Sequence, residues 1–214
     1  MAKNRGRTRR ERKSSGSRNE KLANYFIVTD AEKTEKNYIE GLKKSLPIDK
    51  QERITIKIKT GIRSYKIVEY CEKEMNANPV YSETWIVIDR DEVTGFDEIV
   101  RRAEKRGIKV AWSNPCIETW FSAYFGNIVT DSKSKNCIKS FEKIHKKYIG
   151  CKYEKTDEKI YEKLIKYGDE EKAIERAERM YTKFKEDNKK LPTEMYPCTM
   201  LHKLVYDIKR RANE

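Results

Sequence analysis

The chain has 214 residues, of which 48 are Lys or Arg and 35 are Asp or Glu, so its formal net charge at pH 7 is +13. This length corresponds to one full domain with room for an appendage, and no stretch approaches the ~18 consecutive apolar residues of a membrane-spanning helix. No apolar segment follows the basic N-terminus, so we expect no secretory signal and a cytoplasmic location. The five scattered cysteines form no C-x-x-C pair, which argues against structural zinc or a disulfide framework.

The first 21 residues carry nine Lys or Arg and two Glu, and therefore supply +7 of the net charge. They contain too few apolar residues to bury a face, so we predict a flexible basic arm over residues 1–22. Such an arm either keeps the protein in solution or binds nucleic-acid phosphates. The side chains that would contact phosphates are Arg5, Arg7, Arg9, Arg10 and Arg12.

From Tyr25 onward, short apolar runs alternate with longer segments of helical spacing. Aromatic and β-branched runs predict strands at 25–29, 54–58, 85–88 and 108–112. Apolar residues three and four positions apart predict helices at 34–42, 65–75, 96–103 and 117–124, with Thr34 as the N-cap of the first. This alternation is typical of βαβ units, so we expect an α/β fold with a mostly parallel, four-stranded sheet and helices on both faces.

The last third of the chain shows a different pattern, with further helical spacing and no convincing strand. Helices are expected at 138–148, 158–167, 170–185 and 200–211. We interpret residues 131–214 as a helical extension packed on an α/β domain of residues 23–130.

Acidic residues follow two of the predicted strands. Asp89 and Asp91 come after the third strand and, because side chains alternate along an extended chain, are expected to point the same way. Asp30, Glu32 and Glu35 follow the first strand. Ligands bind at the carboxyl ends of parallel strands, and converging carboxylates repel each other unless a cation neutralises them. A Mg²⁺ site is therefore predicted at this edge. The alternative is that Asp89 and Asp91, the D-x-D pair, belong to an ordinary surface turn.

Two polar residues after the fourth strand are further candidates. Glu118 either completes the metal site or is an acid favoured by the dipole of the helix that it begins. Asn114 either bonds to a ligating carboxylate or, as we favour, forms the turn before Pro115.

Four segments together resemble one protein family. They are TDAEKTEKNYIEGL at 29–42, WIVIDRDE at 85–92, SNPCIETWFSAYF at 113–125 and YPCTMLHKLV at 196–205. In combination they resemble the RloB (AbiL second component) family, which is linked to bacterial abortive infection and phage defence and is similar to Toprim-type nucleases.

The resemblance implies a Toprim-like fold, Mg²⁺- or Mn²⁺-dependent cleavage of nucleic acid and, often, a partner ATPase of the ABC/SMC type. It implies catalytic roles for Asp30, Glu35, Asp89 and Asp91, and it favours RNA, in particular tRNA, as the substrate. The family usually has E-G-E-K-T-E after the first strand, whereas this chain has D-A-E-K-T-E. Asp30 is one methylene shorter than the family glutamate, which leaves Glu32 and Glu35 as alternative ligands.

Basic residues near the acidic strand ends and in the extension are predicted to contact nucleic acid, although a solvated surface is the alternative. They are Lys33, Arg90, Lys146, Lys147 and Lys152. Tyrosines lie among the lysines of the extension and either stack on bases or cover the core; they are Tyr148, Tyr153, Tyr161, Tyr167 and Tyr181.

Other reactive residue types lack partners at useful spacing. Neither His145 nor His202 has a second ligand nearby in the sequence, so packing is expected rather than zinc binding or catalysis. Cys116 and Cys198 have no visible base and are expected to be small buried side chains.

Three functions fit these observations. The first is the metal-dependent nuclease described above. The second is a phosphohydrolase of the haloacid-dehalogenase kind, because residues 89–93 fit D-x-D-x-[TV]; that motif belongs after the first strand of its fold, whereas here it follows the third. The third is a non-catalytic module that binds nucleic acid or senses infection and acts with a partner ATPase. No P-loop or dinucleotide-binding glycine motif is present, so any nucleotide hydrolysis would come from the partner.

Overall fold

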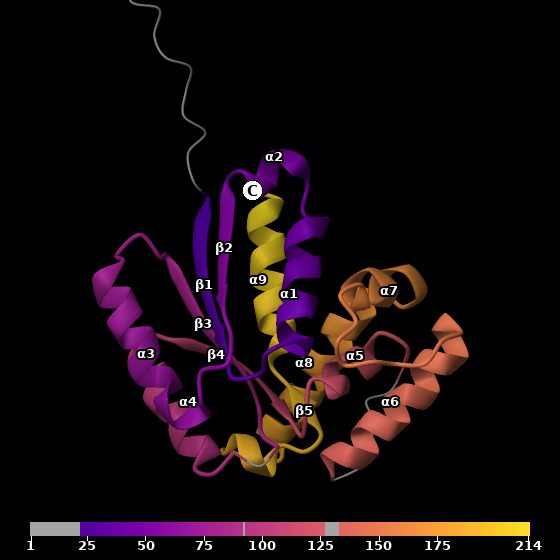
Figure 1. The fold of residues 1–214 in the computed structure, drawn as a ribbon. Coiled ribbons are helices and arrows are strands. Elements are labelled where there is room, and N and C mark those ends of the chain that lie inside the picture. Colours follow the sequence, from indigo (N-terminus) through magenta and orange to yellow (C-terminus); the bar gives the residue numbers. More distant parts are fainter. Residues whose placement is uncertain (1–21, 92, 127–132) are drawn as a thin grey trace, which may run out of the picture.

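The computed structural model of the protein describes residues 22–91, 93–126 and 133–214. Its centre is a five-stranded sheet in the order β2-β1-β3-β4-β5 (Figure 1). The parallel strands are β1 (Ala23–Thr29), β2 (Ile54–Lys59), β3 (Glu83–Asp89) and β4 (Lys109–Asn114). The predicted α/β fold with a mostly parallel sheet is confirmed.

Helices cover both faces of the sheet, which explains why its central strands are apolar on both sides. Figure 1 shows α1 (Thr34–Ser45) and α9 (Leu201–Ala212) on one face, and α3 (Ser64–Ala77) and α4 (Phe96–Glu104) on the other. A short helix, α2 (Ile48–Gln51), precedes β2.

The chain reverses its direction across the sheet at β1. From β1 it passes through α1 to β2 on one side, and from β2 it crosses back through α3 to β3 on the other side. The carboxyl ends of β1 and β3 therefore flank a topological switch point. This is where open α/β sheets bind their ligands.

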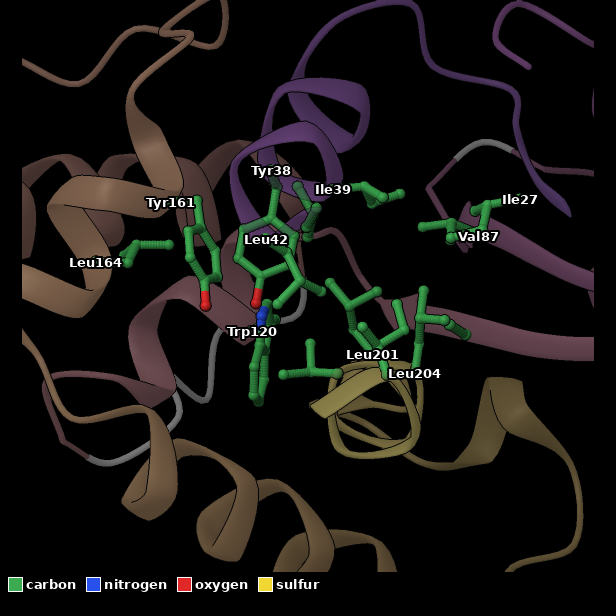
Figure 2. Packing of buried hydrophobic residues seen from close by; sticks show 14 of the residues in the cluster. Ile27, Tyr38, Ile39, Leu42, Val87, Trp120, Tyr161, Leu164, Leu201 and Leu204 are labelled. Carbon is green, nitrogen blue, oxygen red and sulfur yellow. The ribbon is translucent and has the colours of Figure 1, made fainter. Parts of the chain in front are cut away.

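The larger core cluster joins the sheet to helices from the whole length of the chain. Figure 2 shows Leu201 and Leu204 of α9 facing Ile27 and Val87 of the sheet. The same cluster contains residues of α5 (Glu118–Ala123), α6 (Ser134–Ile149), α7 (Ile160–Tyr167) and α8 (Glu170–Glu186). The helices that follow residue 131 thus share a core with the sheet.

A fifth strand lies within the segment in which no strand was predicted. β5 (Cys198–Thr199) pairs antiparallel with β4, and its Thr199 side chain hydrogen-bonds to Ser113 with 3.0 Å between the hydroxyl oxygens. Two residues are too few to show the alternation by which strands are predicted. A 3₁₀ turn, η1 (Pro192–Glu194), precedes it.

None of the helices in the described ranges is long and apolar enough to span a membrane.

Candidate metal centre

Four carboxylates gather at the carboxyl edge of the sheet, around the switch point. Asp30 follows β1, and Asp89 ends the neighbouring strand β3, where Thr29 pairs with Val87. Glu35 lies in the first turn of α1, and Glu118 begins α5 after β4. The negative charges of these side chains act on one another. We call Asp30, Glu35, Asp89 and Glu118 the carboxylate cluster.

Two members of the carboxylate cluster are almost completely buried. Glu118 is 0% exposed and Glu35 is 3% exposed. Glu118 Oε1 accepts a hydrogen bond of 3.0 Å from the Tyr153 hydroxyl. Glu118 Oε2 and Glu35 Oε2 are also buried, yet neither has a hydrogen-bond partner within the described part of the chain. A buried carboxylate oxygen without a partner is costly, and a cation or a water molecule bound here would remove that cost.

The environment of the carboxylate cluster disfavours ionisation. Burial raises the pKa of Asp30 to about 6, and hydrogen bonds from its own amide and that of Ala31 oppose the effect. Burial, followed by the charges of Asp30 and Glu118, raises the pKa of Glu35 to about 7. Burial and the neighbouring acids also raise the pKa of Asp89 well above its usual value, although Asp89 Oδ2 accepts a 3.0 Å hydrogen bond from the Ile117 amide. A cation would relieve this repulsion.

The donor set of the carboxylate cluster suits a hard divalent cation. Every donor is a carboxylate oxygen, the ligand type that Mg²⁺ and Mn²⁺ prefer. In the described ranges no group of three or more His, Cys, Asp or Glu side chains is close enough to hold a metal ion by itself. Mg²⁺ is usually held by one or two carboxylates together with water and substrate phosphate, so the residues fit that ion.

Asp91 and Glu32 are exposed, whereas the four members of the carboxylate cluster are partly or fully buried. Asp89 and Asp91 would share a side only if the strand continued, but β3 ends at Asp89 and the chain turns. Asp91 is exposed, and its amide donates a 3.1 Å hydrogen bond to the carbonyl oxygen of Pro115. Glu32 is exposed and lines an adjoining hollow together with Lys33.

The basic residues predicted to contact nucleic acid lie at the surface. Lys33 and Arg90 are exposed near the carboxylate cluster. Lys146 and Lys152 line one hollow beside α6, whereas the Lys147 ammonium lies 5.0 Å from the centre of the Tyr148 ring. The arginines at positions 5, 7, 9, 10 and 12 lie outside the described residues.

Two polar residues differ from their predicted roles. Thr34 is the first residue of α1 rather than its N-cap, and its hydroxyl donates to the carbonyl oxygen of Lys155. Asn114 hydrogen-bonds to neither a carboxylate nor its own turn: its amide donates to the carbonyl oxygens of Pro192 and Met195, 3.0 Å away in each case, and so fixes η1 against β4.

The remaining candidates are packed inside the protein. His145 and His202 are buried and bond through Nδ1 to the carbonyl oxygens of Cys151 and Thr199. Cys116 and Cys198 are buried free thiols, as expected of small core side chains.

Sequence reasoning missed two residues at this site. Tyr153 was one of several tyrosines among lysines, and Lys155 was one lysine in a basic stretch, so nothing in their spacing distinguished them. The structure places both against Glu118: Tyr153 through its hydrogen bond, and Lys155 with Nζ 3.9 Å from Glu118 Oε1.

The chain matches one family model along most of its length. The model describes RloB-like proteins and matches residues 25–208, a range that contains the carboxylate cluster, nearly all of the sheet and α6 to α8, and most of α9. No curated protein and no solved structure matches the chain. The protein belongs to the RloB-like family.

Proposed function

We propose that the protein is a Mg²⁺- or Mn²⁺-dependent nuclease whose centre is the carboxylate cluster. One observation carries the proposal. On Glu35 and Glu118, two buried carboxylate oxygens have no hydrogen-bond partner among the described residues, and they lie near the switch point of the sheet among acids that repel one another. A cation bound here would neutralise these repelling charges, which supports the proposal.

The chemistry follows from the donor set. A bound divalent ion would neutralise charge on a phosphodiester and activate a water molecule for attack. Asp89 and Glu35, with Asp30 and Glu118, would hold the ion, and the Ile117 amide would keep the Asp89 carboxylate in position. Asp91 remains a predicted ligand; to reach the ion, its side chain would have to move in from the exposed turn that follows β3.

The surface charge supports a polyanionic substrate. The chain carries a net charge of +13 although its proposed centre is acidic. The hollow beside the carboxylate cluster is lined by two lysines, Lys33 and Lys36, by two acids, Glu32 and Glu158, and by uncharged residues that include Thr60 and Gly61. Exposed lysines around an acidic centre would bind phosphates while the ion acts on one of them. We propose RNA as the substrate, with tRNA as the first to test, in an abortive-infection response that involves a partner ATPase.

A digestion assay tests this function. The purified protein is incubated with tRNA, mRNA, and single- and double-stranded DNA, with Mg²⁺, with Mn²⁺ and with EDTA. We expect metal-dependent cleavage that falls by about 100-fold or more in Asp89→Asn, because the charges of all three other acids act on that side chain. Asp49→Asn, an exposed aspartate in α2, is the matched control and should cleave like the wild type.

Asp91→Asn tests whether the second aspartate of the D-x-D motif acts together with the carboxylate cluster. Because Asp91 is exposed beyond the strand, we expect a loss of less than about 10-fold, well short of that of Asp89→Asn. Equal losses in the two variants would make Asp91 a full member of the centre. Cleavage that survives both EDTA and Asp89→Asn would refute the proposal.

A non-catalytic nucleic-acid-binding or sensor module is the second candidate. The observation in its favour is that no three acidic side chains in the described ranges are close enough to hold an ion by themselves. A protein that binds RNA but takes up no Mg²⁺ or Mn²⁺ would support this candidate instead.

A further inference from the structure

The segment between α6 and α7 lies against the carboxylate cluster. Tyr153 is buried, its ring packs edge to face on Phe141 at 4.8 Å between ring centres, and its hydroxyl bonds to Glu118. Two residues later, Lys155 Nζ lies 3.9 Å from the same Glu118 oxygen. A positive charge is thus directed at the most buried acid of the cluster.

Hydrogen bonds fix the backbone of this segment, whereas the Lys155 side chain is largely exposed. Thr34 Oγ1 donates a 2.9 Å hydrogen bond to the carbonyl oxygen of Lys155, and Asn37 Nδ2 donates one of 3.1 Å to the carbonyl oxygen of Thr156. Both donors belong to the start of α1, the helix that carries Glu35. The Lys155 side chain is nevertheless 57% exposed, compared with 1% for the Glu118 side chain. The ammonium can therefore turn away without any movement of the chain that carries it.

The distances indicate a weak contact between Lys155 and Glu118. At 3.9 Å the ammonium is too far from the oxygen for a hydrogen bond. Because the lysine is exposed, the ion pair adds little to the free energy of unfolding. Its charge nevertheless lowers the pKa of Glu35, against the raising effect of burial and of Asp30. Lys155 therefore offsets part of the negative charge that a metal ion would neutralise fully.

We propose that Lys155 is an exchangeable counter-ion: it faces Glu118 in the metal-free protein, and it binds a substrate phosphate once a divalent ion has taken over the neutralisation of the cluster. An ammonium on a flexible stem is suited to this exchange, because it binds phosphate as a compact point charge and needs no fixed geometry. This role rests on the function proposed above.

Two binding measurements test the exchange without relying on cleavage. In calorimetric titrations of Mg²⁺ alone, Lys155→Gln should bind the ion about threefold or more tightly than the wild type, because a like charge beside Glu118 has been removed. In fluorescence anisotropy with a labelled single-stranded RNA and Ca²⁺ in place of Mg²⁺, the same variant should bind RNA several-fold to about 10-fold more weakly, through the loss of one phosphate contact. Lys155→Arg keeps the positive charge, so this variant should bind Mg²⁺ with the wild-type affinity.

Lys152→Gln is the matched control, because Lys152 is exposed on the same segment and lines a hollow on its α6 side. It should leave Mg²⁺ affinity unchanged. An unchanged or lower Mg²⁺ affinity in Lys155→Gln, or an unchanged RNA affinity, would overturn the exchange. So would a wild-type protein that takes up no Mg²⁺. A wild-type protein that binds Mg²⁺ but cleaves no nucleic acid would refute the proposed nuclease function. The calorimetric and anisotropy measurements would still decide the role of Lys155.

Discussion

Glu35 shows what the carboxylate cluster costs the metal-free protein. Its side chain is almost fully buried, one oxygen has no hydrogen-bond partner in the described part of the chain, and burial raises its pKa to about 7. A carboxyl group whose pKa is higher in the folded than in the unfolded state stabilises the fold at low pH. That contribution is lost as the pH rises through the folded pKa, because the folded protein must then hold an unfavourable charge.

Replacing Glu35 by Gln should therefore stabilise the metal-free protein in a pH-dependent way. At pH 8 we expect the free energy of unfolding to rise by about 1–3 kcal/mol, since one pKa unit corresponds to about 1.4 kcal/mol. At pH 5, where Glu35 of the wild type is protonated, the difference should nearly vanish. Urea unfolding in EDTA at the two pH values measures the effect. Glu32→Gln, an exposed acid in the same segment, should change neither value, and a gain for Glu35→Gln that is equal at both pH values would contradict the explanation.

At the scale of elements, Gly41 determines how closely α1 and α7 pack. A Cβ atom at Gly41 would lie 2.4 Å from Tyr161 Cβ, far inside normal contact distance. Tyr161 is fully buried, and Figure 2 shows its ring beside Tyr38 of α1. The missing side chain thus lets α7 lie directly on the helix that carries Glu35.

Gly41→Ala should destabilise the protein although alanine favours helices. The gain in helix propensity is about 1 kcal/mol, whereas forcing apart a closely packed core costs about 1–3 kcal/mol or more. We expect a net loss of about 1–2 kcal/mol in urea unfolding. Lys44→Ala, at an exposed position of the same helix, should stay within about 0.5 kcal/mol of the wild type. A more stable Gly41→Ala variant would show that α7 can shift without cost.

The main strands and helices could be predicted because each has a clear pattern of apolar residues along the sequence. β1 and β3 are continuous apolar runs, and helices such as α4 show one buried stripe, so their existence follows from the sequence. β5 could not be predicted, because its two residues join the sheet only through pairing with β4. Thr34 resembles an N-cap, but its hydroxyl donates a hydrogen bond to the carbonyl oxygen of Lys155. Lys155 is distant in the sequence, so local sequence cannot reveal this contact.

The site was predictable only where its residues follow strands. Asp30 and Asp89 lie at the ends of neighbouring parallel strands, which the topology rule anticipates. Asp91 seemed equivalent to Asp89 in the sequence, yet the end of β3 at Asp89 separates them. Tyr153 and Lys155 reach Glu118 from a distant loop, so tertiary packing alone identifies them.

At the scale of the whole molecule, the last helix is part of the sheet's core. Leu201, Leu204, Val205 and Ile208 of α9 are fully buried in the cluster that contains Trp85, on β3. Helix α9 therefore covers the part of this sheet face that α1 leaves open, where large apolar side chains would otherwise be exposed to water.

A chain that ends at residue 130 should fail to fold cooperatively. It keeps the four parallel strands and α1 but loses α6 to α9, and with α9 a large part of the cover of one sheet face. We expect no sigmoidal unfolding transition in circular dichroism, together with strong binding of a hydrophobic dye. A chain of residues 22–214 contains every described residue and should unfold cooperatively. A cooperative transition in the shorter chain would show that residues 23–130 form a self-sufficient domain.

The dispersal of the cluster along the chain has a consequence for synthesis. Asp30, Glu35 and Asp89 leave the ribosome well before Tyr153, and α9, which closes the core over β3, leaves later still. Proteins fold from the N-terminus as they are made, but here the acids cannot be held in place until Tyr153 and α9 have been synthesised. On the nuclease function proposed above, a nascent chain would therefore be inactive toward the RNAs around it until those later segments have folded.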